Sequence, residues 1–269
     1  MPAPIRLGTQ GWNYDAWAGP FYPEGTKAVD FLTVYSRAFD AVEVDSTFYA
    51  TPPSKTIRGW AQRTPPGFLF SLKLPQEITH ERRLRGVEDL AKEFFDRARE
   101  LEDKLGPVLV QLGADFQSNQ LPALAKFLPT LPEDIGFAIE FRDKGWLNDG
   151  VIALLSEHNV ALTLTDARWI PRKQMLALAE RPTADFVYMR WMGADREIVD
   201  YSRIQIDRSR ELELWTGVIS QLAGRGRSVY GYVNNHFAGH SPSSVRELQR
   251  LLNLTPVDPE QLGEQMTLF

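Results

Sequence analysis

Short runs of apolar, β-branched and aromatic residues recur along the chain and alternate with segments of helical periodicity. Eight such runs predict β-strands that begin at Ile5, Ala41, Phe68, Val108, Gly136, Ala161, Phe186 and Val229. Apolar residues at three- and four-residue spacing predict helices, most clearly at 87–106, 210–226 and 241–254. Alternating strands and helices form parallel βαβ units, and eight such units in about 250 residues predict a (β/α)8 barrel.

A doubly wound open sheet is the alternative for this pattern. The first predicted strand is followed by "GTQGW", which does not match the glycine-rich phosphate fingerprint G-x-G-x-x-G. We therefore expect an α/β protein with one domain, a (β/α)8 TIM-type barrel over residues 1–252. Residues 253–269, "NLTPVDPEQLGEQMTLF", contain two prolines and several acids, which is typical of a tail attached to a finished domain.

Composition narrows the function classes. The 269 residues carry a net charge of −5 and no cysteine, which excludes disulfides, thiolate catalysis and cysteine-ligated zinc. An acidic chain does not coat nucleic acid over its whole surface, although a local basic groove remains compatible with it. The first residues lack the pattern of a signal segment, and no apolar run approaches the roughly 20 residues of a spanning helix. We expect a cytoplasmic protein with no membrane partner.

Polar residues gather late in the predicted strands, whereas the early halves of the strands are mostly apolar. In a TIM barrel the active face lies at the C-terminal strand ends, so one end of the barrel is expected to carry a ring of charge. One interpretation of the ring is a functional site, and the other is a set of acids and bases that neutralise one another. The ring consists of Glu43, Asp45, Lys73, Gln111, Glu140, Arg142, Asp166, Arg190, Asn234 and Asn235.

Candidate acid–base residues lie in this ring and in the loops that follow it. His80 and His236 fall after predicted strands, in "EITHERRLR" and "NNHFAGHS". We expect Glu43, Glu140 or Asp166 to serve as general base or metal ligand and a histidine to serve as acid. Such a set suits a divalent metal such as Zn²⁺ or Mn²⁺, but no H-E-x-x-H motif is present, so the metal stays an open alternative.

Basic residues suggest an anion-binding edge. Arg82 and Arg83 stand beside a histidine in "THERRLR", and Lys73, Arg142 and Arg190 would extend the same edge. Guanidinium groups match phosphate or carboxylate oxygens with two parallel hydrogen bonds. The alternative for the arginine run is a solvated helix start. Aromatic residues of the first two loops, Trp12, Tyr14 and Tyr49 among them, are expected either to stack on a base or sugar or to roof the barrel.

Ordered motifs along the chain give a family resemblance. "GTQGWNYDAWAGPFYP", "FDAVEVDSTFYATPP", "FLFSLKLPQEITH", "IEFRDKGW", "YMRWMG" and "YGYVNNHFAGHS" follow one another from Ile5 to Leu252. In this order they resemble the domain of unknown function 72, or YecE-like, family, which implies a TIM-type barrel but no reaction. Asp45 departs from the family pattern, which commonly has Asn there, so its charge is not expected to be required. The recurrent polar positions that the resemblance implies are Trp12, Tyr14, Glu43, Phe48, Tyr49, Lys73, His80, Glu140, Arg142, Asp166, Arg190, Asn234 and Asn235.

The last residues, "QMTLF", resemble the peptide with which bacterial polymerases and repair proteins dock on the DNA sliding clamp. Gln265, Met266, Leu268 and Phe269 match its pattern of a glutamine followed by apolar anchors. A polar leader lets such a peptide reach a partner, and the anchors fill pockets there. The alternative is that these side chains fold back and pack on the barrel.

These observations favour one function and leave two alternatives. The leading hypothesis is a TIM-barrel protein that binds or processes nucleic acid by phosphodiester or nucleotide chemistry and is recruited to DNA by its tail. The first alternative is a small-molecule hydrolase or isomerase that acts on a sugar or a phosphorylated metabolite, with Glu140 and Asp166 as an acid–base pair. The second is a non-catalytic adaptor associated with DNA.

Overall fold

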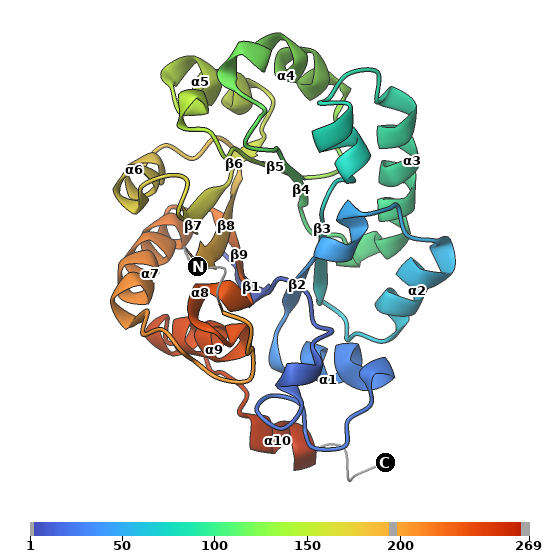
Figure 1. The fold of residues 1–269 in the computed structure, drawn as a ribbon, viewed down its shortest axis with the longest axis vertical. Coiled ribbons are helices and arrows are strands. Elements are labelled where there is room, and N and C mark those ends of the chain that lie inside the picture. Colours follow the sequence, from blue (N-terminus) through green and yellow to red (C-terminus); the bar gives the residue numbers. More distant parts are fainter. Residues whose placement is uncertain (1–2, 194–197, 265–269) are drawn as a thin grey trace.

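A closed ring of parallel strands forms the centre of the protein, in the computed structural model that describes residues 3–193 and 198–264. Figure 1 shows this ring with the helices around its outside. Every pairing between named strands in the described chain is parallel, which confirms the predicted α/β, TIM-type barrel. The strands are β1 (Ile5–Thr9), β2 (Ala41–Val44), β3 (Leu69–Leu72), β4 (Val108–Gln111), β5 (Phe137–Glu140), β6 (Ala161–Leu162), β7 (Leu164–Ala167), β8 (Phe186–Gly193) and β9 (Ser228–Val233).

The nine labelled strands occupy eight positions in the ring. The sixth predicted strand is interrupted at Thr163, and its two parts, β6 and β7, pair with β5 and β8 respectively. Single parallel bridges join the remaining neighbours, Gln10 with Glu43 between β1 and β2, and Lys73 with Leu109 between β3 and β4. The ring is therefore continuous, and all its C-terminal strand ends open at the same face.

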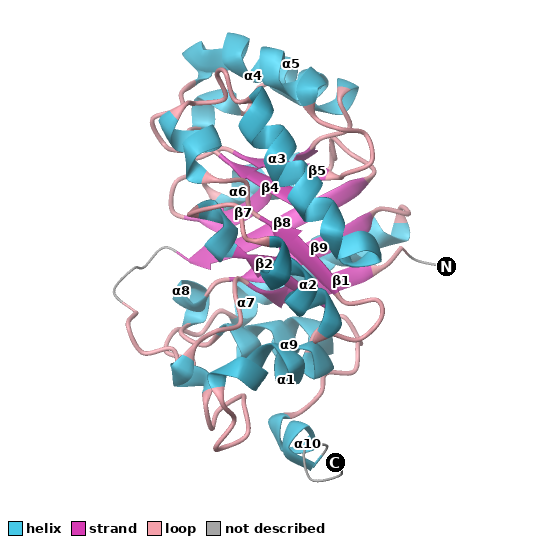
Figure 2. Ribbon diagram, turned by 90° about the vertical axis from the view of Figure 1, so that its right-hand side faces the viewer, coloured by secondary structure: helices cyan, strands magenta, loops and turns pink. Residues whose placement is uncertain are grey.

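Helices cover the outer face of the barrel, as Figure 2 shows from the side. The predicted helices at 210–226 and 241–254 correspond to α7 and α9. The helices are α1 (Phe31–Ala38), α2 (Ser54–Gln62), α3 (Glu88–Ala98), α4 (Leu121–Phe127), α5 (Asp149–Glu157), α6 (Arg172–Leu178), α7 (Ser209–Gly224), α8 (Asn235–Ala238), α9 (Ser241–Leu251) and α10 (Pro259–Glu264).

The helix predicted at 87–106 is shorter than expected. It ends as α3 at Ala98, and a short 3₁₀ segment follows in which Glu102 has a φ of 55°. This left-handed residue turns the chain back toward the barrel. The N–H of Gly106 then donates to the Phe70 carbonyl over 2.9 Å and leads the chain into β4.

The lower part of the barrel interior is closed by side chains. Alternate strand residues point inward, and small side chains such as Ala41 and Ala138 lie opposite the large rings of Tyr188 and Tyr232. The two tyrosine rings are 5.2 Å apart, and the Tyr232 hydroxyl lies 2.8 Å from Ser71 Oγ. Because this layer fills the interior, a ligand that enters at the C-terminal mouth stays above it.

Close approach of β1 and β2 requires a glycine. A Cβ atom on Gly8 would lie 1.9 Å from the Ala41 carbonyl oxygen and 2.9 Å from the Tyr35 hydroxyl. Any larger side chain would force the two strands apart, so the residue sets the closure of the barrel at this point.

Part of the expected tail packs on the domain. Leu262, in α10, is fully buried and belongs to the main hydrophobic core, and Arg250 of α9 lies 3.7 Å from Asp258. Part of the segment after residue 252 therefore contributes to the hydrophobic core. Residues 265–269 lie outside the described part of the chain. Among the helices of residues 3–193 and 198–264, none combines the length and apolar character that crossing a membrane requires.

Candidate functional site

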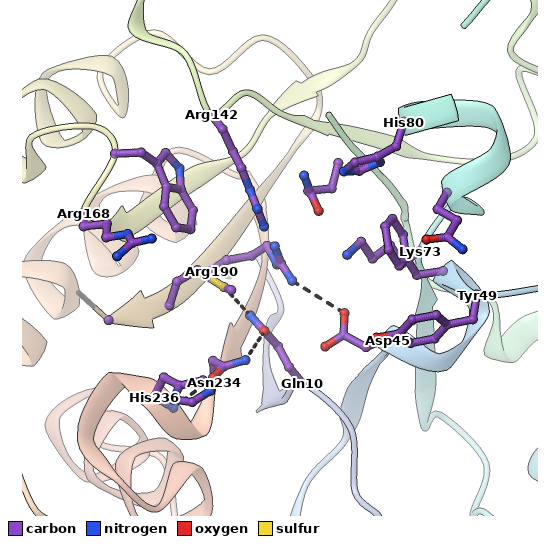
Figure 3. Close-up of a pocket in the computed structure, with 16 residues that line it drawn as sticks. Gln10, Asp45, Tyr49, Lys73, His80, Arg142, Arg168, Arg190, Asn234 and His236 are labelled. Carbon is purple, nitrogen blue, oxygen red and sulfur yellow. Dashed lines mark hydrogen bonds and ion pairs between the residues drawn. The ribbon is translucent and has the colours of Figure 1, made fainter. Parts of the chain in front are cut away.

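A cavity of about 620 Å³ opens at the C-terminal mouth of the barrel, where the sequence predicts the active face (Figure 3). Its walls come from strand ends and from the loops that follow them. Gln10, Asp45, Phe48, Tyr49, Lys73, Gln76, His80, Gln111, Arg142, Arg168, Trp169, Arg190, Met192, Gly193, Asn234 and His236 line it.

A buried ionic cluster forms the floor of the cavity. Arg190 Nη2 donates to Glu43 over 2.7 Å, and its Nη1 donates to Glu140. The Tyr188 hydroxyl donates to Glu43 over 2.7 Å. Arg190 is 2% exposed and both glutamates are fully buried. Burial of an isolated ion is costly, and here each charge has a partner on a neighbouring or facing strand.

The floor charges differ in their proton affinities. Burial raises the pKa of Glu43 above its ordinary value, against the opposing attraction of Arg190. Burial acts in the same direction on Glu140, but Arg190 and Arg142 more than offset it, so the pKa of Glu140 lies below its ordinary value. The two carboxylates hold the pKa of Arg190 well above its usual range despite its burial. Arg190 is therefore a fixed cation, and Glu140 is ionised at neutral pH.

Further cations line the walls. The Arg142 guanidinium lies 4.8 Å from the centre of the Trp169 ring, and Lys73 Nζ lies 3.9 Å from the centre of the Phe48 ring. Arg168 adds another cation from the loop after β7. Four of the described lining residues are lysine or arginine, whereas one, Asp45, is a carboxylate. The cavity therefore suits an anion.

His80 lies at the edge of the cavity on a π-helical turn, Glu77–Glu81. Its Nδ1 is 2.8 Å from Thr79 Oγ1, and its ring packs edge-on against Phe48. Partial burial, with the nearby Lys73 as the next cause, lowers the pKa of His80 below its ordinary value. At neutral pH the ring is uncharged and can accept a proton, so it fits the role of base rather than the expected role of acid.

Amide side chains and a second histidine complete the opposite wall. Asn234 donates to Gln10 Oε1 over 2.8 Å and accepts the backbone N–H of His236. His236 Nε2 is 3.1 Å from the Tyr201 hydroxyl. This network fixes the orientation of the amide groups that face the cavity.

Asp166 does not face the cavity, and its expected pairing with Glu140 is wrong. The Asp166 carboxylate accepts hydrogen bonds from Arg172 Nε over 2.6 Å and from Trp215 Nε1 over 2.7 Å. In the β7–β8 register it lies beside Trp191, which belongs to the outer core, whereas Arg190 one position earlier points inward. Asp166 therefore anchors the outer helices and lies on the opposite face of the barrel wall from Glu140.

Arg82 and Arg83 do not extend the cationic wall, in contrast to the expectation from the sequence. Arg82 is paired with Glu77 at 2.7 Å, and Arg83 is paired with Asp115. Both arginines are roughly half exposed and lie outside the cavity lining. Arg82 and Arg83 therefore lie on a solvated turn and are already paired with acids.

Three further expected residues support the loops rather than line the cavity. Asn235 is buried, and its Oδ1 accepts the backbone N–H of Ser241 at the start of α9. Trp12 packs edge-on against Trp60, and the Tyr14 hydroxyl donates to a backbone carbonyl over 3.0 Å. Glu43 and Glu140 likewise lie beneath the cavity, where they balance the charge of its floor.

Potential metal ligands are not clustered in the described part of the chain. Among residues 3–193 and 198–264, no cluster of three or more histidine, aspartate or glutamate side chains is placed to hold a metal ion. The carboxylates nearest the cavity floor, Glu43 and Glu140, are engaged by Arg190. The residues present fit an anionic ligand better than a divalent cation.

Several lining residues were not among those expected to bind substrate. Arg168 and Trp169 directly follow β7 in "LTDARWI", where a loop at the active face begins, and this position is a signal for them. Gln10 directly follows β1 in the same way, whereas Gln111, at the end of β4, was already part of the expected polar ring. Gln76 carries no comparable signal, because its place depends on the π-helical turn.

A parallel eight-position barrel with a polar pocket at its C-terminal mouth defines a TIM-barrel protein. Within that class the chain belongs to the family described as "Protein of unknown function DUF72", which its residues 6–266 match.

Three relatives illustrate the family. The chain is 33% identical over 138 residues to the UPF0759 protein YecE of Escherichia coli K12, a match that covers 51% of this chain and about half, 48%, of that protein. It is 24% identical over 285 residues to the UPF0759 protein YunF of Bacillus subtilis, covering 96% and 99% of the two chains. The crystal structure of a DUF72 family protein from Thermotoga maritima superposes with a TM-score of 0.77 at 23% identity, covering 93% and 99%, and shares the fold.

Proposed function

We propose that this protein binds a phosphorylated small molecule in the cavity and catalyses a reaction on it. The observation that carries the proposal is the charge of the lining, in which four lysine or arginine side chains accompany a single carboxylate. Arg190 is held rigidly by its two glutamates, which balance its charge, so the guanidinium groups that an anion would meet unbalanced are those of Arg142 and Arg168 on the walls.

Cavity size and the position of the cations favour a small molecule over a nucleic acid strand. A volume of about 620 Å³ falls within the range of roughly 300–1,000 Å³ that is usual for small-ligand sites. A bound strand would need a track of cations leading away from the cavity, but Arg82 and Arg83 are already paired with acids. Trp169, Phe48 and Tyr49 provide ring faces for a sugar or another planar group.

Roles follow from geometry and charge. Arg142 and Arg168 are the guanidinium groups best suited to hold a phosphate, because they lie on the wall and are not held by two carboxylates as Arg190 is. Arg142 makes one long contact with Glu140, at 3.4 Å. His80 is the candidate general base, since its ring is neutral at pH 7 and faces the same space. Glu43 and Glu140 serve in this scheme to position Arg190.

Calorimetric titration of the full chain tests the proposal. The probes are glyceraldehyde 3-phosphate, ribose 5-phosphate and adenosine monophosphate, each with its unphosphorylated counterpart, and a 20-nucleotide single strand. We expect the phosphorylated small molecules to bind at least tenfold more tightly than their counterparts. Arg142→Gln should weaken binding about tenfold, because a charge-assisted hydrogen bond contributes about 1.5–3 kcal/mol.

Arg99→Gln is the matched control, because Arg99 forms an exposed ion pair with Asp134 away from the cavity. It should bind like the unaltered protein. Equal affinity for phosphorylated and unphosphorylated probes, or binding of the oligonucleotide alone, would overturn the proposal.

Recruitment to a DNA sliding clamp is a second proposal, supported by the sequence "QMTLF". Gln265 begins this motif directly after α10, whose Leu262 is anchored in the core. A pull-down with purified bacterial clamp should retain the full chain and lose a chain that lacks residues 265–269. Retention of both forms, or of neither, would remove the recruitment proposal and leave the cavity proposal intact. If the protein is a non-catalytic adaptor, Arg142→Gln should keep the cellular effect, and deletion of residues 265–269 should abolish it.

A further inference from the structure

Lys73 occupies an unusual position for a lysine. It directly follows β3, its side chain is 8% exposed, and it points into the cavity (Figure 3). Its backbone is fixed, because Thr47 Oγ1 donates to the Lys73 carbonyl over 2.7 Å and accepts the Lys73 N–H over 2.9 Å. A side chain that starts from a clamped backbone has a defined direction.

The amino group has no carboxylate within ion-pair distance. Within the described chain, Lys73 Nζ makes no hydrogen bond or ion pair, and it lies 3.9 Å from the centre of the Phe48 ring. Asp45, Glu140 and Glu43 attract it only from further away. Glu43 and Glu140, the buried acids of the floor, are engaged by Arg190. A buried lysine is normally paired with a carboxylate, so an unpaired one indicates a use other than stability.

Its surroundings shift the proton equilibrium toward the neutral amine. Burial, followed by the neighbouring Arg190, lowers the pKa of Lys73 below its ordinary value, although Asp45, Glu140 and Glu43 act in the opposite direction. A neutral amine carries the lone pair that attacks carbonyl carbon, and desolvation beside another cation is a known way to activate a lysine nucleophile.

We propose that Lys73 is a nucleophile that forms a Schiff base with the carbonyl group of a phosphorylated aldehyde or ketone. This inference rests on the proposed function of the cavity and names its substrate class. Arg142 and Arg168 hold the phosphate, and the carbonyl end of the ligand lies against Nζ.

The covalent step balances without an added oxidant or reductant. The Nζ lone pair bonds to the carbonyl carbon, and one amine proton moves to the former carbonyl oxygen, giving a carbinolamine. Loss of that hydroxyl with a second proton as water leaves the C=N bond, which a further proton converts to the iminium. His80, which packs on the same Phe48 ring as Lys73, can take and return these protons. Addition of water reverses the sequence.

Reductive trapping tests the proposal. The full chain is incubated with sodium cyanoborohydride and either glyceraldehyde 3-phosphate or glyceraldehyde, and the modified lysines are identified by peptide mass spectrometry. We expect Lys73 to be modified at least tenfold faster by the phosphorylated probe, and inorganic phosphate should slow the reaction. Lys92 and Lys126, which are exposed, report background labelling in the same sample. Uniform labelling of all lysines, or none at Lys73, would overturn the Schiff base.

Ligand binding, measured in parallel with adduct formation, distinguishes the Schiff-base proposal from the proposed function of the cavity. Lys73→Arg has no primary amine, so it should lose the adduct while still binding inorganic phosphate. If the unaltered protein binds glyceraldehyde 3-phosphate but forms no adduct, the nucleophile is wrong and the proposed function stands. If it does not bind the phosphorylated probe, both proposals fail. Because the site of labelling is mapped in the unaltered protein, the result does not depend on how well the variant folds.

Discussion

Arg190 and Glu43 face each other across the barrel floor, and Arg190 donates to Glu43 through both Nε and Nη2. The two residues lie 147 positions apart in sequence, on β8 and β2, and neither is more than 2% exposed. The pair joins distant parts of the ring and sets the charge beneath the cavity.

Loss of the Glu43 charge should destabilise the fold strongly. In Glu43→Gln, Arg190 keeps Glu140 but loses its second carboxylate, and breaking a buried ion pair costs about 3–5 kcal/mol. Urea unfolding should show this loss in the free energy of unfolding. Glu247→Gln is the control, because its pair with Arg250 is exposed, and a change of less than about 1 kcal/mol is expected there. Equal effects of the two substitutions would contradict the floor's structural role.

Acid should weaken the fold through His240 before most carboxylates titrate. Burial, with Arg246 as the second cause, lowers the pKa of His240 from 6.5 to about 4. Since the unfolded chain takes up this proton at a higher pH than the folded one, the contribution of His240 is fully present above pH 6.5 and is lost as the pH falls toward 4. The resulting loss in the free energy of unfolding amounts to about 3 kcal/mol once the pH is below 4.

Urea unfolding at several pH values measures this dependence. His240→Asn removes the titrating group and keeps a polar side chain near Ser243, which His240 contacts at 2.7 Å. The variant should lose much less stability than the unaltered protein between pH 6.5 and 4.5. Parallel curves for the two proteins would show that His240 is not the source.

The sequence predicts the barrel fold and the end of the barrel at which the site lies, but it does not predict the direction of every side chain. Lys73, Arg142 and Arg190 could be predicted because they follow apolar strand halves at the C-terminal end. Asp166 could not, because strands of a barrel are buried on both faces and show no polar alternation. The break at Thr163 further hides which residues of that strand point inward.

The arginine loop shows a second limit of sequence reasoning. Arg82 and Arg83 were expected to bind anions because they stand next to His80, which does line the cavity. Their partners, Glu77 and Asp115, depend on the turn and on a different loop. Charge neutralisation across loops is a property of tertiary structure, so a basic run alone could not predict it.

Closure of the barrel at β1 should depend on the absence of a side chain at Gly8. Gly8→Ala would place a Cβ atom 1.9 Å from the Ala41 carbonyl, which requires the backbone to move. We expect a loss of about 3 kcal/mol or more in the free energy of unfolding. Gly59→Ala, in α2, meets no atom within 4 Å and should instead stabilise by about 0.5–1 kcal/mol. A tolerated alanine at position 8 would show that the strand spacing is adjustable.

Substitutions at Asp166 and Arg142 should affect different properties, the free energy of unfolding in the first case and ligand affinity in the second. Asp166→Asn weakens the contact with Arg172 on the outer side of the barrel, so it should lower the free energy of unfolding by about 2 kcal/mol. The affinity of Asp166→Asn for glyceraldehyde 3-phosphate should not change, because Asp166 faces away from the cavity.

Arg142→Gln should show the opposite pattern, with affinity reduced about tenfold and the free energy of unfolding nearly unchanged. The Arg142 side chain is 23% exposed, and its contact with Glu140 is long at 3.4 Å. Urea unfolding and calorimetry on both variants give the four measurements. A loss of affinity in Asp166→Asn at full stability would return this carboxylate to the site and contradict its assignment to the outer wall.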